Sequence, residues 1–198
     1  MMPRQPDRRP KPTPRSAQPG RTKTDAIEEI LRVDHAGEYG AVRIYSGQLA
    51  VYKYLAGKQD TVESLTRMAK EEEVHLARFT DIINERGVRP TAFAPIWHVA
   101  GFALGAATAL MGEKAAHACT EAVEDVIDEH YAQQVKKLDA MGTEESALRE
   151  TIERFRLEEV QHRDEAIEKG AKEAPGYTLL SAVIRAGCKV AIKLSEKA

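Results

Sequence analysis

Two phrases in the sequence place a histidine three residues after a glutamate. Glu72 and His75 form the first pair, and Glu159 and His162 form the second. Residues i and i+3 lie on one face of a helix, so each phrase would direct a carboxylate and an imidazole at the same point. Two such helices, with one Glu from each of two others, supply the ligands of a dimetal site in a four-helix bundle.

The positions of the two phrases carry more weight than their number, which is close to chance expectation. Both phrases lie on the apolar seam of a long helical pattern, where Glu is rarely found unless it is paired or binds a metal. The first seam is Leu65, Met68, Glu72, His75, Phe79 and Ile82. The second seam is Leu148, Ile152, Phe155, Glu159, His162 and Ala166.

Two more glutamates complete the ligand set. Glu38 shares an apolar stripe with Leu31 and Tyr45, and Glu124 shares one with Tyr131. Glu38 and Glu124 are 86 residues apart, and both residues of the Glu-x-x-His phrases recur after 87 residues. The chain therefore contains two helix pairs in the same order, and the sequence predicts an all-α four-helix bundle with an internal two-fold repeat.

The chemistry of the six residues favours a pair of iron ions. Four buried carboxylates would repel one another, and two divalent ions would balance their charge. Carboxylate and imidazole ligands suit iron and manganese. A salt-bridged core is the structural alternative, but no Lys or Arg lies on the same stripes. Such a site supports iron storage, peroxide removal or oxygenation of an organic substrate, and the residues alone do not choose among these.

The remaining pattern predicts one folded domain, residues 24–198, behind a basic tail, residues 1–23. The tail holds six of the nine prolines and almost no apolar side chains, so we expect it to be disordered. Glycine and proline positions divide the domain into helical segments. We expect helices over residues 25–55, 61–86, 96–111, 113–141, 144–173 and 177–198.

Two of these segments have more than one interpretation. Residues 96–111 form an apolar run that fits a buried crossover helix, or a helix that lines a substrate site or dips into a membrane. Residues 177–198 are amphipathic, with Arg185, Lys189, Lys193 and Lys197 in one cationic stripe. That pattern fits a helix in a membrane interface, and it also fits an ordinary packing helix.

The stretch Arg32-Val33-Asp34-His35-Ala36-Gly37-Glu38-Tyr39-Gly40-Ala41 resembles the demethoxyubiquinone hydroxylases of ubiquinone biosynthesis. So do residues 118–120 with 122–124, the His130-Tyr131 pair, and residues 175–180 with 186–188, and the resemblance covers about residues 25–198. It implies a ferritin-like di-iron monooxygenase that hydroxylates the ring of a polyprenylated methoxy-benzoquinol with O2 and a reductant such as NADH. The next enzyme would methylate the new hydroxyl.

The resemblance also implies roles for individual residues. The metal ligands carry over onto Glu38, Glu72, His75, Glu124, Glu159 and His162, the six residues chosen above. Tyr131 matches a tyrosine implicated in electron transfer. Lys189 stands where some relatives carry Arg. From its position one turn before Glu38, Asp34 is a candidate partner for a ligand histidine, with a surface or capping role as the alternative.

A polyprenyl quinone lives in the bilayer, so the resemblance implies a peripheral membrane protein whose partners are lipid and quinone. The expected location is the cytoplasmic face of a bacterial membrane, or alternatively the matrix side of the mitochondrial inner membrane. A homo-oligomer or a complex of ubiquinone biosynthesis is compatible with this, and no nucleic-acid partner is expected. The rival function is iron oxidation or peroxide reduction by a ferritin- or rubrerythrin-like protein, although the chain lacks a cysteine-rich rubredoxin module.

Overall fold

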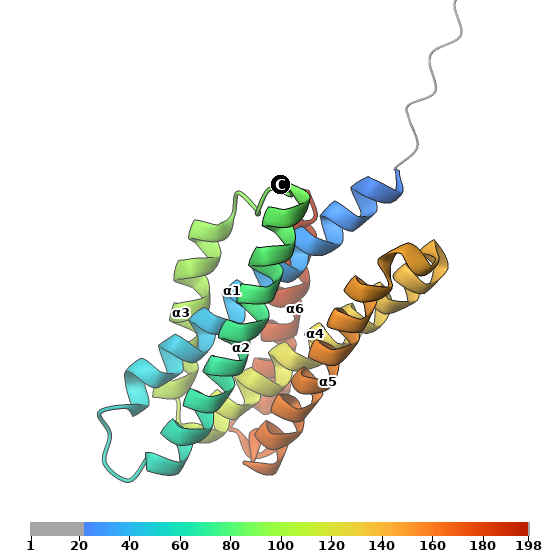
Figure 1. Cartoon of the computed structure of the whole chain (residues 1–198). Coiled ribbons are helices and arrows are strands. Elements are labelled where there is room, and N and C mark those ends of the chain that lie inside the picture. Colours follow the sequence, from blue (N-terminus) through green and yellow to red (C-terminus); the bar gives the residue numbers. More distant parts are fainter. Residues whose placement is uncertain (1–21, 198) are drawn as a thin grey trace, which may run out of the picture.

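The computed structural model describes residues 22–197, and every regular element within them is helical (Figure 1). The all-α prediction is confirmed. The predicted tail falls almost wholly on residues 1–21, which lie outside the described residues. The long helices are α1 (Lys23–Tyr52), α2 (Gln59–Arg86), α3 (Ala94–Leu110), α4 (Glu113–Met141), α5 (Ser146–Glu168) and α6 (Tyr177–Ser195). Two single-turn 3₁₀ helices, η1 (Thr143–Glu145) and η2 (Ala171–Glu173), flank α5.

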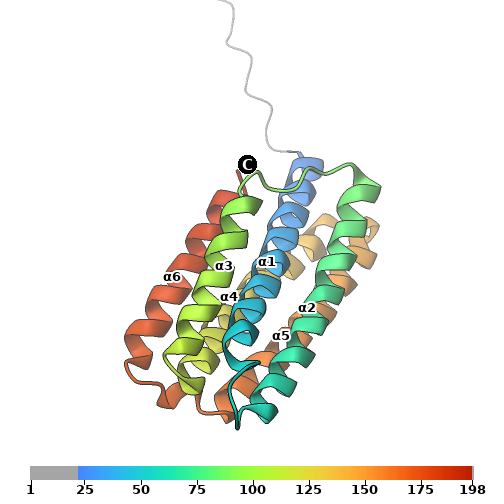
Figure 2. The ribbon, with the colours of Figure 1, turned by 90° about the vertical axis from the view of Figure 1, so that its left-hand side faces the viewer.

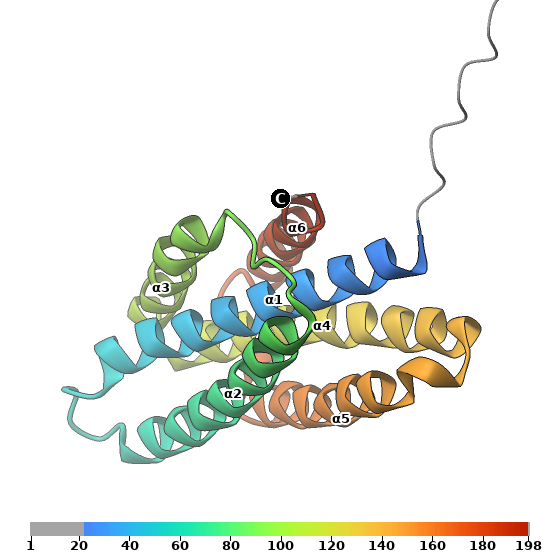
Figure 3. The same ribbon diagram turned by 45° about the horizontal axis from the view of Figure 1, so that its top comes forward.

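The six long helices form three layers, which can be followed in the tilted view of Figure 3. α1 and α4 make the middle layer, with α2 and α5 on one side of it and α3 and α6 on the other. α1, α2, α4 and α5 are the ferritin-like four-helix bundle, and α3 crosses over between its two pairs. The two helix pairs therefore occur in the predicted order.

The start of α1 and the end of α5 differ from the predicted positions, because a capping residue sets the first and a glycine sets the second. α1 begins at Lys23 rather than near Asp25, because Thr22 is the N-cap. The Oγ of Thr22 accepts from the backbone N–H of Asp25 at 3.1 Å, and the carboxylate of Asp25 accepts from the N–H of Thr22 at 2.9 Å. α5 ends at Glu168 rather than at residue 173, because Gly170 adopts a φ of 89°.

Glycine lets α3 pack directly on the backbone of α1. A Cβ on Gly105 would lie 1.9 Å from the carbonyl oxygen of Ile44, and one on Gly47 would lie 2.2 Å from that of Phe102. The Tyr52 hydroxyl also donates to the carbonyl of Ala109 at 3.0 Å. Small residues at the crossing, rather than large interdigitating side chains, therefore hold these two helices together.

Two apolar clusters lie at opposite ends of the bundle, and the polar seam residues lie between them. Along α2, Leu65 and Met68 belong to one cluster and Phe79 and Ile82 to the other, with Glu72 and His75 in the intervening turns. The same order holds along α1 and α4, whereas α5 contributes only to the cluster that contains Phe79 and Ile82. Apolar packing on both sides thus fixes the height at which the polar side chains face one another.

The structure bears on the alternative interpretations of the two segments that form α3 and α6. α3 is not a buried crossover helix, since the side chains of Ile96 and Val99 are 55% and 66% exposed. On α6, Arg185 donates to Glu121 of α4 at 2.8 Å, and Lys189 pairs with Glu129 at 2.9 Å. These two cations of the stripe therefore attach α6 to the protein. Among the described residues, no helix combines the length and the apolar character needed to cross a bilayer.

Candidate metal centre

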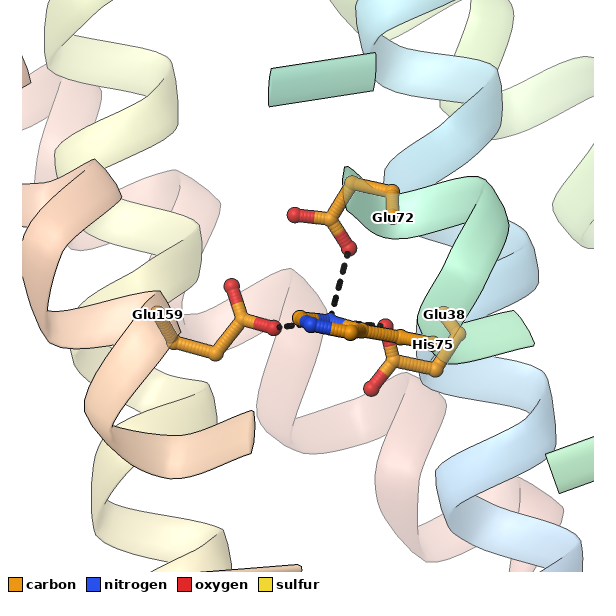
Figure 4. Close-up of side chains that lie close together, drawn as sticks. All are labelled: Glu38, Glu72, His75 and Glu159. Atoms are coloured by element: carbon orange, nitrogen blue, oxygen red, sulfur yellow. Dashed lines mark ion pairs between the residues drawn. The ribbon is translucent and has the colours of Figure 1, made fainter. Parts of the chain in front are cut away.

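The six predicted ligands converge between the middle layer and the α2–α5 layer. They form two overlapping clusters whose ligand atoms lie within 4.8 Å of one another. One cluster is Glu38, Glu72, His75 and Glu159, drawn in Figure 4. The other is Glu72, Glu124, Glu159 and His162. Glu72 and Glu159 belong to both clusters, so the geometry distinguishes these two central carboxylates from Glu38 and Glu124.

The inward-facing atoms of the centre have no hydrogen-bond partner. Both oxygens of Glu72 and of Glu159 are buried and unpartnered, as is one oxygen each of Glu38 and Glu124 and the Nδ1 of each histidine. Buried polar atoms are normally satisfied, and orphans in a native structure point to an ion or another missing partner. Within residues 22–197, no Lys or Arg forms an ion pair with the four carboxylates, and the basic groups nearest to them are the imidazoles of His75 and His162.

The donor set and its orphaned atoms fit a pair of metal ions. Two carboxylates with both oxygens free can each bridge two ions, and each histidine offers one nitrogen to one cluster. The Nδ1 of His75 lies 2.9 Å from Glu159, and the Nδ1 of His162 lies 3.1 Å from Glu72. Neither approach has the angles of a hydrogen bond, as expected for lone pairs converging on a common centre.

Each histidine is held from behind by a carboxylate of the opposite helix. The Nε2 of His75 on α2 lies 2.6 Å from Glu158 of α5, and the Nε2 of His162 on α5 lies 2.7 Å from Glu71 of α2. Such a partner fixes the tautomer and orientation of a metal-binding imidazole, leaving Nδ1 free to bind. The two outer carboxylates are 41% and 40% exposed, so they also connect the centre to solvent.

The outer carboxylates were missed in the sequence. Glu71 lies beside the seam and is 41% exposed, so its position gives no sign of the contact with His162. A signal did exist: each phrase reads Glu-Glu-x-x-His rather than Glu-x-x-His, with an acid directly before the seam glutamate. The crossing of the bonds between α2 and α5 is a tertiary feature that spacing along either helix does not show.

Two buried tyrosines donate hydrogen bonds to Glu38 and Glu124, and each tyrosine belongs to the opposite helix pair from its glutamate. The hydroxyl of Tyr45 on α1 donates to Glu124 of α4 at 2.9 Å, and the hydroxyl of Tyr131 on α4 donates to Glu38 of α1. Each tyrosine lies seven residues after the glutamate on its own helix. Tyr131, the predicted electron-transfer residue, is thus next to the centre, and Tyr45 occupies the matching position.

Without a metal, the centre holds protons in the place of positive ions. Burial opposes the charge on His75, but the nearby carboxylates of Glu159 and Glu38 outweigh it and raise the pKa of His75 to about 11. Burial likewise opposes the charge on His162, but Glu159 and Glu124 outweigh it and raise the pKa of His162 to about 9. Burial and the neighbouring carboxylates raise the pKa of Glu72 and of Glu124 well above the usual range. Metal binding must displace these protons.

Asp34 is not the partner of a ligand histidine, so that prediction is wrong. It is buried, and one oxygen accepts from the Nε2 of Gln134 at 2.6 Å. The same amide nitrogen lies 2.7 Å from the Nε2 of His130, which is 3.7 Å from Asp34. Of two other histidines, His98 is exposed and His117 is buried.

An apolar cleft lies on the other side of the middle layer. Figure 2 shows α3 and α6 running side by side over α1 and α4. The cleft between these four helices has a volume of about 440 Å³, and its wall is almost entirely apolar. Gly37 and Val123 line it directly before Glu38 and Glu124 in the sequence. α1 and α4 therefore form a wall of the cleft and a wall of the candidate centre.

The fold and the two overlapping clusters define a ferritin-like bundle able to hold metal ions. The sequence model of one protein family, described as "Ubiquinone biosynthesis protein COQ7", matches residues 25–195. The chain belongs to this family, and the predicted family resemblance is confirmed.

Relatives of the chain occur in bacteria and in eukaryotes. The "3-demethoxyubiquinol 3-hydroxylase" of Rhodospirillum rubrum is 53% identical over 171 residues, covering 86% of this chain and 78% of the relative. The "NADPH-dependent 3-demethoxyubiquinone 3-hydroxylase, mitochondrial" of Rattus norvegicus is 48% identical, covering 87% and 78%. The "5-demethoxyubiquinone hydroxylase, mitochondrial" of Saccharomyces cerevisiae is 37% identical, covering 86% and 78%.

Proposed function

We propose that the protein hydroxylates the ring of a demethoxyubiquinol, using O2 and a reductant, in the penultimate step of ubiquinone biosynthesis. The observation that carries this proposal is the metal-binding geometry directly behind the wall of an apolar cleft. Family membership and the hydroxylase names of the relatives support the same activity.

Six residues would hold two iron ions. Glu38 and His75 would serve one ion, Glu124 and His162 the other, and Glu72 and Glu159 would bridge them. Carboxylate and imidazole donors without thiolates suit ferrous iron. Two reduced irons would supply the O2 activation that the hydroxylation needs. Tyr131 and Tyr45 would keep Glu38 and Glu124 turned toward their ions, and Tyr131 would also pass electrons.

The overall reaction consumes a ring C–H, one O2, two electrons and two protons, and yields a ring C–OH and water. NADH, NADPH or another reductant would supply the electrons, and the name of the rat relative supports a nicotinamide donor. The cleft would take the polyprenyl quinol, with its ring toward Glu38 and Glu124. Protons can enter on the opposite side, where Glu71 and Glu158 reach solvent.

The protein would meet its substrate as a peripheral membrane protein. Exposed apolar side chains lie along α3 and α6, the two helices that flank the cleft: Ile96, Val99, Leu110, Leu179, Val183, Val190 and Leu194. An apolar face around the mouth of the cleft would let a lipid-dissolved tail enter from the bilayer. The cytoplasmic face of a bacterial membrane is the proposed site, with the mitochondrial inner membrane, matrix side, as the alternative.

Liposome flotation tests this membrane contact. Leu179, Val183 and Val190 are exposed, so their replacement by Ser should weaken flotation without unfolding the protein. Leu180 and Ile184 are unsuitable targets, because they pack in the core between α4 and α6. A matched triple substitution at exposed positions of α5, such as Leu157, Gln161 and Asp164 to Ser, should leave flotation unchanged. Equal flotation of both variants and the wild type would contradict the proposed face.

The cleft favours hydroxylation over the rival function. A protein that oxidises iron or reduces peroxide handles small inorganic substrates and needs no organic cavity beside its metals. Product analysis decides between them. The iron-loaded protein, supplied with reductant, O2 and a demethoxyquinol, should form the hydroxylated quinol, and Glu159→Ala should form none. Absence of product from the iron-loaded wild type would overturn the proposed activity.

A further inference from the structure

The glycines of the helical layers fall into two groups with different reasons to be glycine. Gly47, Gly101 and Gly105 lie at the α1–α3 crossing, where a Cβ would approach a backbone oxygen to 2.9 Å or less. Their small size is required by helix packing. Three others need a different explanation, because they lie in helix interiors and none has a positive φ: Gly37, Gly40 and Gly187.

A Cβ added at any of these three positions would meet nothing within 4 Å. Glycine inside a helix costs stability relative to alanine, through backbone entropy and the loss of side-chain contacts. Neither packing nor backbone conformation offsets that cost here. All three positions do share one property, which is that they line the apolar cleft.

The three glycines lie on two different helices of the cleft wall. Gly37 and Gly40 are on α1, on either side of Glu38 in the sequence, and Gly187 is on α6. Gly37 and Gly187 are exposed and Gly40 is half-buried, so a side chain at any of them would occupy open space along the wall of the cleft. The space that they leave free therefore adjoins the helical turn that presents Glu38 to the candidate centre.

We infer that Gly37, Gly40 and Gly187 determine which substrates the enzyme accepts, by keeping the cleft wide enough for a flat substituted ring beside Glu38. This inference rests on the proposed function, since it assigns the ring of the quinol to this part of the cleft. An alkyl chain is thinner than a substituted ring, so the glycines select for the ring and not for the tail. Glycine at these positions makes the fold less stable than alanine would, and it keeps the cleft wide.

Binding can be measured without metal or turnover, because the single Trp of the chain lines the same cleft. Trp97 lies in the wall, and its indole N–H donates to the Oγ of Ser195 at 3.2 Å. A decyl-tailed benzoquinone bound there should quench the fluorescence of Trp97. The full-length protein is titrated with this probe, and the melting temperature of each variant is recorded.

The decisive variants are Gly37→Leu and Gly187→Leu, with Ala186→Leu as the matched control. Ala186 is exposed and adjacent to Gly187, but it does not line the cleft. We expect each glycine variant to bind the quinone about tenfold more weakly, the effect of an overpacked contact, and the control to bind like the wild type. Gly37→Ala and Gly187→Ala should raise the melting temperature by about 2–4 °C while weakening binding less than the Leu variants do.

The outcomes separate this inference from the proposed function. Saturable quenching of the wild type, matched by the glycine variants, would overturn the role of the glycines and leave the quinone site intact. No saturable quenching of the wild type would overturn both. Weaker binding accompanied by a lower melting temperature in the Ala variants would also contradict the inference, because it would show that the glycines are needed for packing.

Discussion

The α1–α2 pair and the α4–α5 pair place nearly the same side chains around the centre. Glu38, Tyr45, Glu71, Glu72 and His75 of the first correspond to Glu124, Tyr131, Glu158, Glu159 and His162 of the second. The pairs differ just outside this set. Asp34 is buried and bonded to Gln134, whereas the corresponding Thr120 has a buried hydroxyl without a hydrogen-bond partner. The residues around the candidate centre are therefore repeated in both helix pairs, while the residues just outside them give the two clusters different environments.

The largest effect should separate the shared carboxylates from the unshared ones. Glu72→Ala or Glu159→Ala removes a residue common to both clusters, so either change should abolish binding at both metal positions. Glu38→Ala or Glu124→Ala removes a residue of one cluster, so each should abolish binding at one position only. Metal analysis after gel filtration measures the stoichiometry. Equal losses in all four variants would contradict the assignment of Glu72 and Glu159 as bridging residues.

The outer carboxylates should give the next largest effect. Glu71→Gln and Glu158→Gln weaken the partner that fixes each histidine, so metal affinity should fall about 10–100-fold in each variant. Competition with a chelator measures this affinity. Glu73→Gln changes an exposed neighbour on the same helix and should leave affinity unchanged. A loss confined to Glu71→Gln or to Glu158→Gln would show that the crossed arrangement is not functionally symmetric.

The two tyrosines test whether electron transfer follows the repeat. Tyr45→Phe and Tyr131→Phe each remove one hydrogen bond to a buried glutamate, so each should destabilise the protein by about 1–2 kcal/mol. Denaturant unfolding measures this cost. If Tyr131 carries electrons, hydroxylation per bound metal should fall further in Tyr131→Phe than in Tyr45→Phe. Equal rates in the two variants would remove the special role of Tyr131.

The smallest effect should come from Asp34, and it should depend on pH. Burial, and then the charge of Glu38, raise the pKa of Asp34 well above its usual value, so the folded protein binds this proton more tightly than the unfolded chain does. The stability that this proton contributes is complete below a pH of about 4 and is lost as pH rises through the folded pKa. Asp34→Asn, which keeps an oxygen for Gln134, should therefore gain stability relative to the wild type as pH rises. Thermal melts of the metal-free proteins across pH measure the difference, and a constant difference would contradict the raised pKa.

Periodicity was sufficient to find the six residues of the candidate centre, because a glutamate on an apolar seam is conspicuous along a single helix. It was not sufficient to find their partners. Glu71 and Glu158 lie at half-exposed positions, where acids are ordinary, and their function depends on the helix opposite. The predicted partner of Asp34 was wrong for the same reason, because its actual partner, Gln134, is 100 residues away in the sequence. On α6, Arg185 and Lys189 form a stripe in the sequence, but acids of α4 neutralise them in the fold.

The crossed bonds also bear on when the protein can acquire its metals. Each cluster takes three residues from one helix pair and a single carboxylate from the other. Each histidine is also held by a side chain of the opposite pair, and so are Glu38 and Glu124. During synthesis, the first helix pair emerges with an incomplete set and with its histidine still unsupported. A metal ion would therefore bind only after the second pair has docked, so the complete centre would form at the end of folding.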